Sequence, residues 1–414
     1  MNKIAVLFPG QGAQYIGMGK TICRDFKAAD YMFNEANEIL GFDIKALCFE
    51  GDLDELTKTE NAQPALLTAS VAAFKVLRKI SEVTPFYLAG HSLGEFSALV
   101  CSKAISFSDA LKLVRKRGEL MAKASQGGMA AVMGAGEAEI RAVCEQVSTR
   151  DCFAVVSNNN SPDQIVISGH KQAIAKAGEV LSNMGVKVKA LNVSAAFHSP
   201  LMTDAADEFK ELLENTVFRI PSWPVISNVT AKPITASSTL AEELYRQLIS
   251  PVQWQKTMSF MQNHNVNTFI DIGPGQVVKN LASKNIPDAQ AYAFDKPKEL
   301  ESIINEYPVN PFKPKISFLP KAMAIAVCTK NNNWDNSEYE AGVIKPYNEV
   351  QSINSRLEET GAEATEEQMK IAVDMLSSVF TCKRTPIDEQ AERFTQLFDD
   401  TDTWGAVPGF KLPV

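Results

Sequence analysis

Along the first part of the chain, short continuous apolar runs alternate with segments in which apolar residues recur every three or four positions. Continuous apolar runs at 4–8 and 87–89 predict buried strands, since a strand covered on both faces carries few polar residues. Apolar residues at 28–40 and 64–77 recur every three or four positions, which predicts amphipathic helices. Strand-like and helix-like segments alternate again from about residue 204. This alternation predicts a large α/β unit.

A different order of elements separates these two stretches. From residue 129 to 193 the pattern is strand, helix, strand, strand, helix, strand, which is the order of a ferredoxin-like domain. After about residue 307 several prolines mark a linker, and three helix-sized segments follow at 346–357, 366–380 and 386–398.

These patterns predict an α/β protein of three parts. The large subdomain comprises residues 1–128 and 197–306, and a ferredoxin-like small subdomain at 129–196 is inserted into it. Residues 307–414 form a linker and a mainly helical C-terminal extension.

Composition limits the classes of function. The 414-residue chain is 45% hydrophobic and 22% charged, as in ordinary globular proteins with a substantial core. Its net charge of −8 argues against nucleic acid as a main partner, and no apolar run is long enough to cross a membrane. The seven cysteines are scattered, and none forms a C-x-x-C pair. This usage predicts reduced thiols in a cytoplasmic protein and no metal site.

A serine on a sharp turn is the strongest candidate for chemistry. Ser92 lies in Gly-His-Ser-Leu-Gly, after an apolar strand and before a helix-compatible stretch. In a G-x-S-x-G turn of this kind, the glycines let neighbouring chain pass close by, and the serine hydroxyl projects from the backbone as a nucleophile. The alternative interpretation is an ordinary turn between a strand and a helix.

A nucleophilic serine needs a base within hydrogen-bond reach, and the chain has four histidines. His91 should leave the turn in another direction, His170 opens a helix of the small subdomain, and His264 lies in a polar loop. His198 stands among small residues, an aromatic residue and a proline, where the chain leaves the small subdomain. Clefts form at such junctions, so we predict that His198 is the base.

Arg117 is the third candidate. Its spacing places it on the apolar helix face of Val114 and Met121 rather than with Arg115. Because a buried guanidinium is costly unless paired, this position calls for a partner that can pair with it. A solvated surface cation is the alternative, since other basic residues surround it.

The loop 9–14 follows the first strand and is rich in glycine. It lacks the third glycine of a dinucleotide-binding fingerprint, because Tyr15 stands at that place. We expect the loop to bring a main-chain N–H group close to the nucleophile instead.

Several motifs in one order resemble malonyl-CoA:acyl-carrier-protein transacylases over roughly residues 1–305. They are Phe8-Pro9-Gly10-Gln11-Gly12-Ala13-Gln14, Gln63-Pro64-Ala65, Gly90-His91-Ser92-Leu93-Gly94-Glu95, Arg117-Gly118, Asn160-Ser161-Pro162, Phe197-His198 and Gly273-Pro274-Gly275. The resemblance implies an α/β-hydrolase-like large subdomain with a ferredoxin-like small one. It also implies that Ser92 takes malonyl from malonyl-CoA and passes it to the phosphopantetheine thiol of an acyl carrier protein, with no permanently bound cofactor.

The resemblance also implies roles for further residues. The backbone N–H groups of Gln11 and Leu93 match the family's oxyanion hole, and Gln63 matches a polar residue lining the site. In this family a backbone carbonyl orients the histidine, and Gln253 is predicted to provide it. His198 then serves as base and, later, as the acid for the departing thiol.

Substrate choice is implied by two residues. Arg117 matches the residue that engages the malonyl carboxylate. Phe197, before the histidine, resembles polyketide-type transferases that choose malonyl over methylmalonyl, although Ala195 departs from their usual pattern.

Two other classes of function remain open. A related acyl hydrolase would clear stalled acyl groups from carrier proteins, but it has no use for a carboxylate clamp. A non-catalytic binding module would not need Ser92, His198 and Gln11 together.

The C-terminal extension resembles that of stand-alone acyltransferases serving polyketide synthases in trans. It is predicted to dock a synthase module or a carrier protein; a stabilising appendage without a partner is the alternative. The choice between polyketide and fatty acid synthesis is left open.

Overall fold

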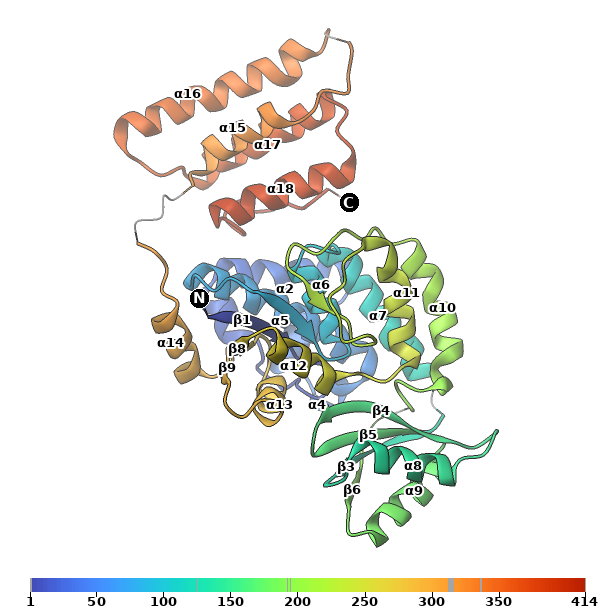
Figure 1. Cartoon of the computed structure of the whole chain (residues 1–414). Coiled ribbons are helices and arrows are strands. Elements are labelled where there is room, and N and C mark those ends of the chain that lie inside the picture. The colour runs from blue at the N-terminus through green and yellow to red at the C-terminus, as the bar shows by residue number, and fades with distance from the viewer. Residues whose placement is uncertain are drawn as a thin grey trace. The chain divides into compact units, whose positions relative to one another are not determined.

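The computed structural model describes residues 2–124, 126–191, 193, 195–311, 316–335 and 337–413. By its internal contacts the chain divides into two compact units (Figure 1). Unit 1 comprises residues 1–22 and 32–309, and unit 2 comprises residues 23–31 and 310–414. Residues 23–31 lie within the range 1–128 predicted for the large subdomain. They group with unit 2 because Ala28 is buried in its core and the Tyr31 ring packs on Trp404, with centroids 4.9 Å apart.

The large subdomain of unit 1 is built on a five-stranded sheet in the order β7-β2-β1-β8-β9. All neighbouring strands are parallel. The strands are β1 (Lys3–Phe8), β2 (Tyr87–Gly90), β7 (Val225–Ile226), β8 (Val266–Asp271) and β9 (Gln290–Ala293). Phe8 of β1 pairs with Gly90 of β2, so the loops that follow these strands leave the same edge of the sheet side by side.

Helices pack against this sheet and against one another, as the alternating pattern predicts (Figure 1). Those in contact with its strands are α6 (Gly94–Cys101), α12 (Trp254–Asn263), α13 (Val277–Asn285) and α14 (Pro297–Glu306). The further helices are α3 (Ile44–Glu50), α4 (Leu53–Thr57), α5 (Thr59–Ile80), α7 (Phe107–Lys123), α10 (Thr203–Glu214) and α11 (Leu240–Ile249), with the short 3-10 helices η1 (Pro200–Met202) and η2 (Ser237–Thr239). Helices α1 (Lys20–Asp25) and α2 (Lys27–Leu40) include residues of the segment 23–31, which groups with unit 2. One buried cluster joins residues of β1, β2 and β8 to apolar side chains of α12 and α13. Helix α5 is buried along most of its length.

The small subdomain has the predicted ferredoxin-like order. Strands β3 (Gly128–Met133), β4 (Ala154–Ser161), β5 (Gln164–Gly169) and β6 (Lys187–Ala190) form an antiparallel sheet in the order β4-β5-β3-β6. Helices α8 (Glu137–Val147) and α9 (Lys171–Asn183) lie together on one face of it (Figure 1). Strand β4 also bonds to the large subdomain, because Asn159 N–H donates to the Val252 carbonyl at 2.9 Å.

Unit 2 is helical. The three predicted helices are present as α16 (Lys345–Thr360), α17 (Glu366–Cys382) and α18 (Ile387–Thr401). A fourth helix, α15 (Phe318–Cys328), differs from the prediction, in which Pro320 belongs to the linker. A proline in the first turn of a helix is tolerated, since that turn's N–H groups have no helical partner anyway. A short π-helix, η3 (Glu340–Ile344), precedes α16.

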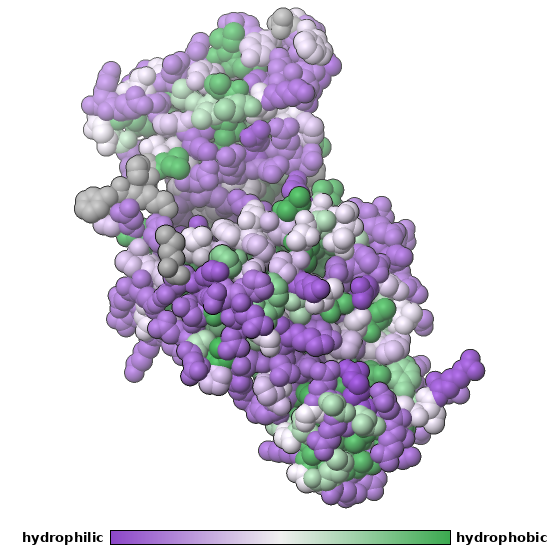
Figure 2. All heavy atoms as spheres, in the orientation of Figure 1, coloured by the Kyte–Doolittle hydropathy of each residue, from purple (hydrophilic) through white to green (hydrophobic). Residues whose placement is uncertain are grey.

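No described helix is both long and apolar enough to span a membrane. On the face drawn in Figure 2, hydrophilic residues are spread over both units and apolar residues gather only in small groups.

Candidate active site

Ser92 lies on a strained turn between β2 and α6, with a φ of +49° and a partly exposed side chain. A Cβ atom on Gly90 would lie 1.8 Å from the Gly94 carbonyl carbon, and one on Gly94 would lie 2.2 Å from the Phe8 oxygen. Only glycine fits at either position. The tight turn predicted from the G-x-S-x-G pattern is therefore confirmed.

Of the four histidines, His198 is the one that contacts the serine. Its Nε2 lies 2.8 Å from Ser92 Oγ, and the residue is 4% exposed. His91 instead turns its Nε2 to Asn160 Oδ1, at 2.8 Å. His170 and His264 hydrogen-bond with main-chain atoms of Phe153 and Phe260, respectively.

The carbonyl that orients His198 belongs to Gln247, and the prediction of Gln253 is wrong. His198 Nδ1 donates to the Gln247 carbonyl at 2.8 Å, while the Gln253 carbonyl accepts from Thr257 N–H of α12 at 2.9 Å. The reason lies in helix α11. A helical carbonyl normally accepts from the N–H group four residues later, and here that residue is Pro251, which has no N–H. The free carbonyl fixes Nδ1 as the donor, so Nε2 can accept the serine proton.

Arg117 is 1% exposed, and its guanidinium is surrounded by neutral groups. Nη1 donates to Gln63 Oε1 at 2.9 Å, and Nη2 donates to Gln247 Oε1 at 2.9 Å and to Ser92 Oγ at 3.2 Å. The guanidinium carbon lies 5.7 Å from the centroid of the Phe96 ring. Among the described residues, no carboxylate forms an ion pair with Arg117. The placement on the buried helix face is as predicted.

Burial lowers the pKa values of Arg117 and His198. It lowers the pKa of Arg117 to about 10, so this side chain stays protonated at neutral pH. Burial, and then the positive charge of Arg117, lower the pKa of His198 to about 3. The imidazole is therefore neutral at physiological pH, which is the form that can accept a proton.

Gln11 and Leu93 lie on the two loops that leave the sheet side by side. A Cβ atom on Gly10 would lie 2.5 Å from the His91 carbonyl oxygen, so the first loop packs directly on the serine turn. Within the described part of the chain, neither the Gln11 nor the Leu93 main-chain N–H group has a hydrogen-bond acceptor. Two N–H groups beside a nucleophile can bind a developing oxyanion.

Other predicted residues lie around this centre. Gln63 is fully buried and holds Arg117, and its Nε2 lies 3.3 Å from Met121 Sδ. Phe197 is 6% exposed and precedes His198 in the chain.

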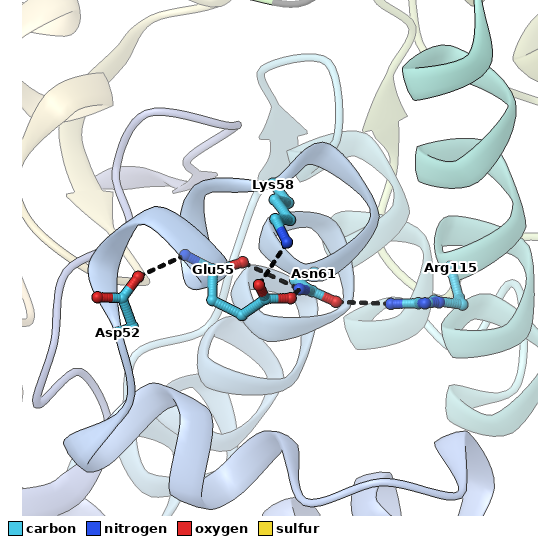
Figure 3. Close-up of polar contacts among 5 residues, drawn as sticks. All are labelled: Asp52, Glu55, Lys58, Asn61 and Arg115. Carbon is cyan, nitrogen blue, oxygen red and sulfur yellow. Dashed lines mark hydrogen bonds and ion pairs between the residues drawn. The ribbon is translucent and has the colours of Figure 1, made fainter.

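A polar network fixes helix α5, which carries Gln63, against helix α7, which carries Arg117 (Figure 3). Asn61 Nδ2 donates to Glu55 Oε1 at 2.8 Å, and its Oδ1 accepts from Arg115 Nη1 at 2.7 Å. Lys58 forms an ion pair with Glu55 at 2.5 Å. These bonds join α4, the start of α5 and α7.

Three contributing residues escaped the sequence analysis: Gln247, Asn228 and Glu95. The Asn228 amide forms two hydrogen bonds with the serine turn. Its Oδ1 accepts from Ser92 N–H and its Nδ2 donates to the Gly90 carbonyl, both at 2.7 Å. Glu95 accepts from Gln247 Nε2 at 2.5 Å. A signal for Gln247 exists, because a glutamine on the buried face of α11 four residues before a proline is unusual. Asn228 follows the strand next to β2, but nothing in its local pattern marks it.

In the part of the chain that the structure describes, no group of three or more His, Cys, Asp or Glu side chains could hold a metal ion.

Comparison with known proteins agrees with this geometry. The model of the acyl transferase domain family matches residues 6–293. This chain belongs to the acyl transferase family. A Bacillus subtilis protein named malonyl CoA-acyl carrier protein transacylase is 37% identical over 94% of this chain and 99% of its own length. The polyketide biosynthesis malonyl CoA-acyl carrier protein transacylase PksC of Bacillus subtilis (strain 168) is 43% identical over 70% of this chain and 99% of its own length.

Solved structures of acyl transferases are also similar. The crystal structure of FabD from Acinetobacter baumannii matches with a TM-score of 0.71 and 38% identity, covering 74% of this chain and 98% of that one. A malonyl-transacylase in complex with a type II PKS acyl-carrier protein matches with a TM-score of 0.71 and 37% identity, covering 73% of this chain and 99% of that one.

The contact between α5 and α7 predicts the effect of one substitution in this acyl transferase. A Cβ atom on Gly118 of α7 would lie 2.6 Å from Glu60 Cα and 2.7 Å from the Thr59 oxygen. We expect Gly118→Ala to push the helices apart and to lower the free energy of unfolding by about 1–3 kcal/mol, measured by urea denaturation.

Gly178→Ala in α9 is the matched control, because the new Cβ would meet only Val188 Cγ1, at 3.5 Å. This variant should be as stable as the unmodified protein, or up to about 1 kcal/mol more stable. Equal stability of the two variants would show that the close approach at Gly118 is unimportant.

Proposed function

We propose that this protein transfers a malonyl group from malonyl-CoA to the phosphopantetheine thiol of an acyl carrier protein, through a malonyl ester on Ser92. The observation that carries this function is the buried Arg117 guanidinium, 3.2 Å from the serine oxygen, which pairs with no carboxylate of the described residues. The names of the similar transacylases support the same reaction. No permanently bound cofactor forms part of the proposal.

The first half-reaction uses the neutral His198. As Ser92 Oγ attacks the thioester carbonyl, Nε2 takes its proton, and the resulting oxyanion receives hydrogen bonds from the N–H groups of Gln11 and Leu93. The C–S bond then breaks, and His198 protonates the departing thiolate of coenzyme A. In the second half the carrier thiol gives its proton to His198 and attacks the ester. The bond between the acyl carbon and Ser92 Oγ breaks, and His198 returns the proton to Oγ, so that Ser92 is regenerated.

Arg117 selects the acyl group in this proposal. A malonyl ester on Ser92 carries its carboxylate a few bonds from Oγ, within reach of a guanidinium that already contacts Oγ. The carboxylate would supply the anion that Arg117 lacks, and a guanidinium binds a carboxylate in a bidentate geometry. Phe197 lies buried beside the histidine, and we propose that it disfavours the extra methyl group of methylmalonyl.

No observation favours the two other classes of function. An acyl hydrolase gains nothing from a buried guanidinium next to its nucleophile, and a binding module has no need for the contact between Ser92 and His198. The names of similar proteins include a polyketide enzyme, but the pathway of this chain is not assigned. Its cytoplasmic location stays a prediction.

We also propose that unit 2 docks a polyketide synthase module or the carrier protein within it. The similarity to one Bacillus subtilis transacylase covers 94% of this chain, so that relative shares sequence with the helical extension. The presence of this extension in a second transacylase supports the proposal that unit 2 takes part in acyl transfer.

Covalent labelling tests the reaction itself. With labelled malonyl-CoA and no carrier protein, we expect one malonyl group per chain, on the peptide that contains Ser92, and none in Ser92→Ala. Added carrier protein should remove the label as malonyl-carrier. Release as free malonate without carrier protein would indicate a hydrolase, and no label at all would indicate a binding module.

Substitution of Arg117 tests substrate choice. Burying the malonyl carboxylate without its partner costs about 2–5 kcal/mol, so Arg117→Ala should lower kcat/KM for malonyl-CoA by at least about 30-fold. Transfer of neutral acetyl should be kept or increased. Arg246→Ala, which removes an exposed cation beside Gln247, is the control and should keep both activities. Malonyl turnover equal to that of the unmodified protein would rule out the assignment of Arg117.

A shortened chain, in which residues 23–31 remain, tests the 310–414 part of unit 2. Tyr307 belongs to unit 1, where its carbonyl accepts from Glu82 N–H at 3.0 Å, so the chain should end at Val309. We expect transfer to an isolated carrier protein to be kept and transfer to the carrier within its cognate synthase to fall. Thermal unfolding checks that unit 1 stays folded. Equal rates with both forms of the carrier would indicate a stabilising appendage.

A further inference from the structure

Glu95 is a buried carboxyl group for which the proposed mechanism has no use. It lies in the first turn of α6, three residues after Ser92, and is 1% exposed. Its Oε2 accepts from Gln247 Nε2 at 2.5 Å, and its Oε1 accepts from the Asn228 N–H group at 3.3 Å. Burying an acid costs free energy unless its oxygens are satisfied, so its place directly behind the nucleophile calls for a physical reason.

The Gln247 side chain, which Glu95 contacts, has a donor end and an acceptor end. Its Nε2 donates to Glu95 Oε2 and to the Ser92 carbonyl, the latter at 3.0 Å. Its Oε1 accepts from Arg117 Nη2 at 2.9 Å. If the amide were reversed, its NH₂ group would face the guanidinium and its oxygen would face two other oxygens. The carboxylate therefore determines which end of the amide meets Arg117.

We propose that Glu95 is a positioning residue for substrate selection, which acts by holding the Gln247 amide so that Arg117 meets the carboxylate of the acyl group on Ser92. This inference rests on the proposed malonyl transfer. Glu95 does not touch the reacting atoms. It acts on the Arg117 guanidinium, which donates hydrogen bonds to the side-chain oxygens of Gln63 and Gln247 and is oriented by them.

The ionised form of Glu95 is the one that fits these contacts, because both of its oxygens face N–H donors. Burial raises the pKa of this carboxyl to about 8, while the donors Gln247 and Asn228 and the charge of Arg117 act in the opposite direction and Glu243 adds to the rise. Assays above pH 8 therefore compare variants with the carboxylate form.

Glu95→Gln tests the proposal in the full-length protein. In the variant, one carboxylate oxygen of residue 95 becomes an NH₂ group. This new donor faces either Gln247 Nε2 or the Asn228 N–H group, which are donors themselves. The Gln247 side chain therefore loses its fixed orientation. We expect kcat/KM for malonyl-CoA to fall about 10- to 100-fold, the range for a lost hydrogen bond to a charged group. Transfer of acetyl should change only a few-fold, because acetyl has no carboxylate for Arg117 to hold.

The ratio of malonyl to acetyl transfer separates positioning from a merely structural role. Through Asn228, Glu95 also supports the serine turn, and damage to that turn would lower both activities equally. In an Arg117→Ala background, Glu95→Gln should leave the ratio unchanged, since the residue on which it acts is gone. Equal losses for the two acyl groups, or a further drop of the ratio in that background, would overturn the proposal.

Two further variants complete the test. Glu243→Gln makes the same chemical change on α11, where Glu243 accepts from Ser227 Oγ at 2.5 Å; it should keep the ratio. Gln247→Leu removes the amide but keeps the main-chain carbonyl for His198, and it should lower the ratio as Glu95→Gln does. An unchanged ratio in Gln247→Leu would overturn the proposal even if Glu95→Gln failed to fold. If the unmodified protein did not transfer malonyl, the proposed function itself would fail.

Discussion

The guanidinium of Arg117 is buried beside the nucleophile with no anion in contact among the described residues. Removing a guanidinium from water costs several kcal/mol unless other groups compensate for the lost hydration. Here the compensation comes from the oxygens of Gln63, Gln247 and Ser92 and from the face of Phe96. These groups are neutral, and they occupy donors on Nη1 and Nη2, while the buried Nε has no partner among the described residues. Glu95 acts on the charge only through space and forms no ion pair with it. A site of this kind favours an acyl group that brings its own carboxylate.

The same charge affects the chemistry at the serine. Together with burial it lowers the pKa of His198, and a neutral imidazole is the form that can accept the serine proton. A carboxylate partner on Nδ1, as in other serine enzymes, would stabilise the imidazolium. In this protein a main-chain carbonyl holds the ring instead. The Gln247 residue thus has two tasks, because its carbonyl orients His198 and its side chain contacts Arg117, Glu95 and the Ser92 carbonyl.

Several features of the fold and the site could be predicted because they are local. Gly90 and Gly94 are required by contacts within a few residues of Ser92 and by one neighbouring loop, so the turn is visible as a sequence pattern. The burial of Arg117 follows from its spacing on one helix. The two kinds of sheet follow from the order of elements. The helix α15 was missed because Pro320 is compatible with both a linker and a first helical turn, and only packing against the other helices of unit 2 distinguishes them.

Local patterns in the sequence suffice to predict that a sharp turn presents a serine, that a histidine follows the inserted subdomain, and that an arginine lies on an apolar helix face. Which atoms meet depends on how distant segments pack. The tertiary structure places the Gln247 carbonyl, and not that of Gln253, on His198, and it brings Asn228 and Glu95 behind the serine turn. The physical reason is that these hydrogen bonds join groups more than 45 positions apart. Their geometry comes from the packing of α11 on α10 and from the loop after β7 that meets the serine turn, which no local pattern encodes.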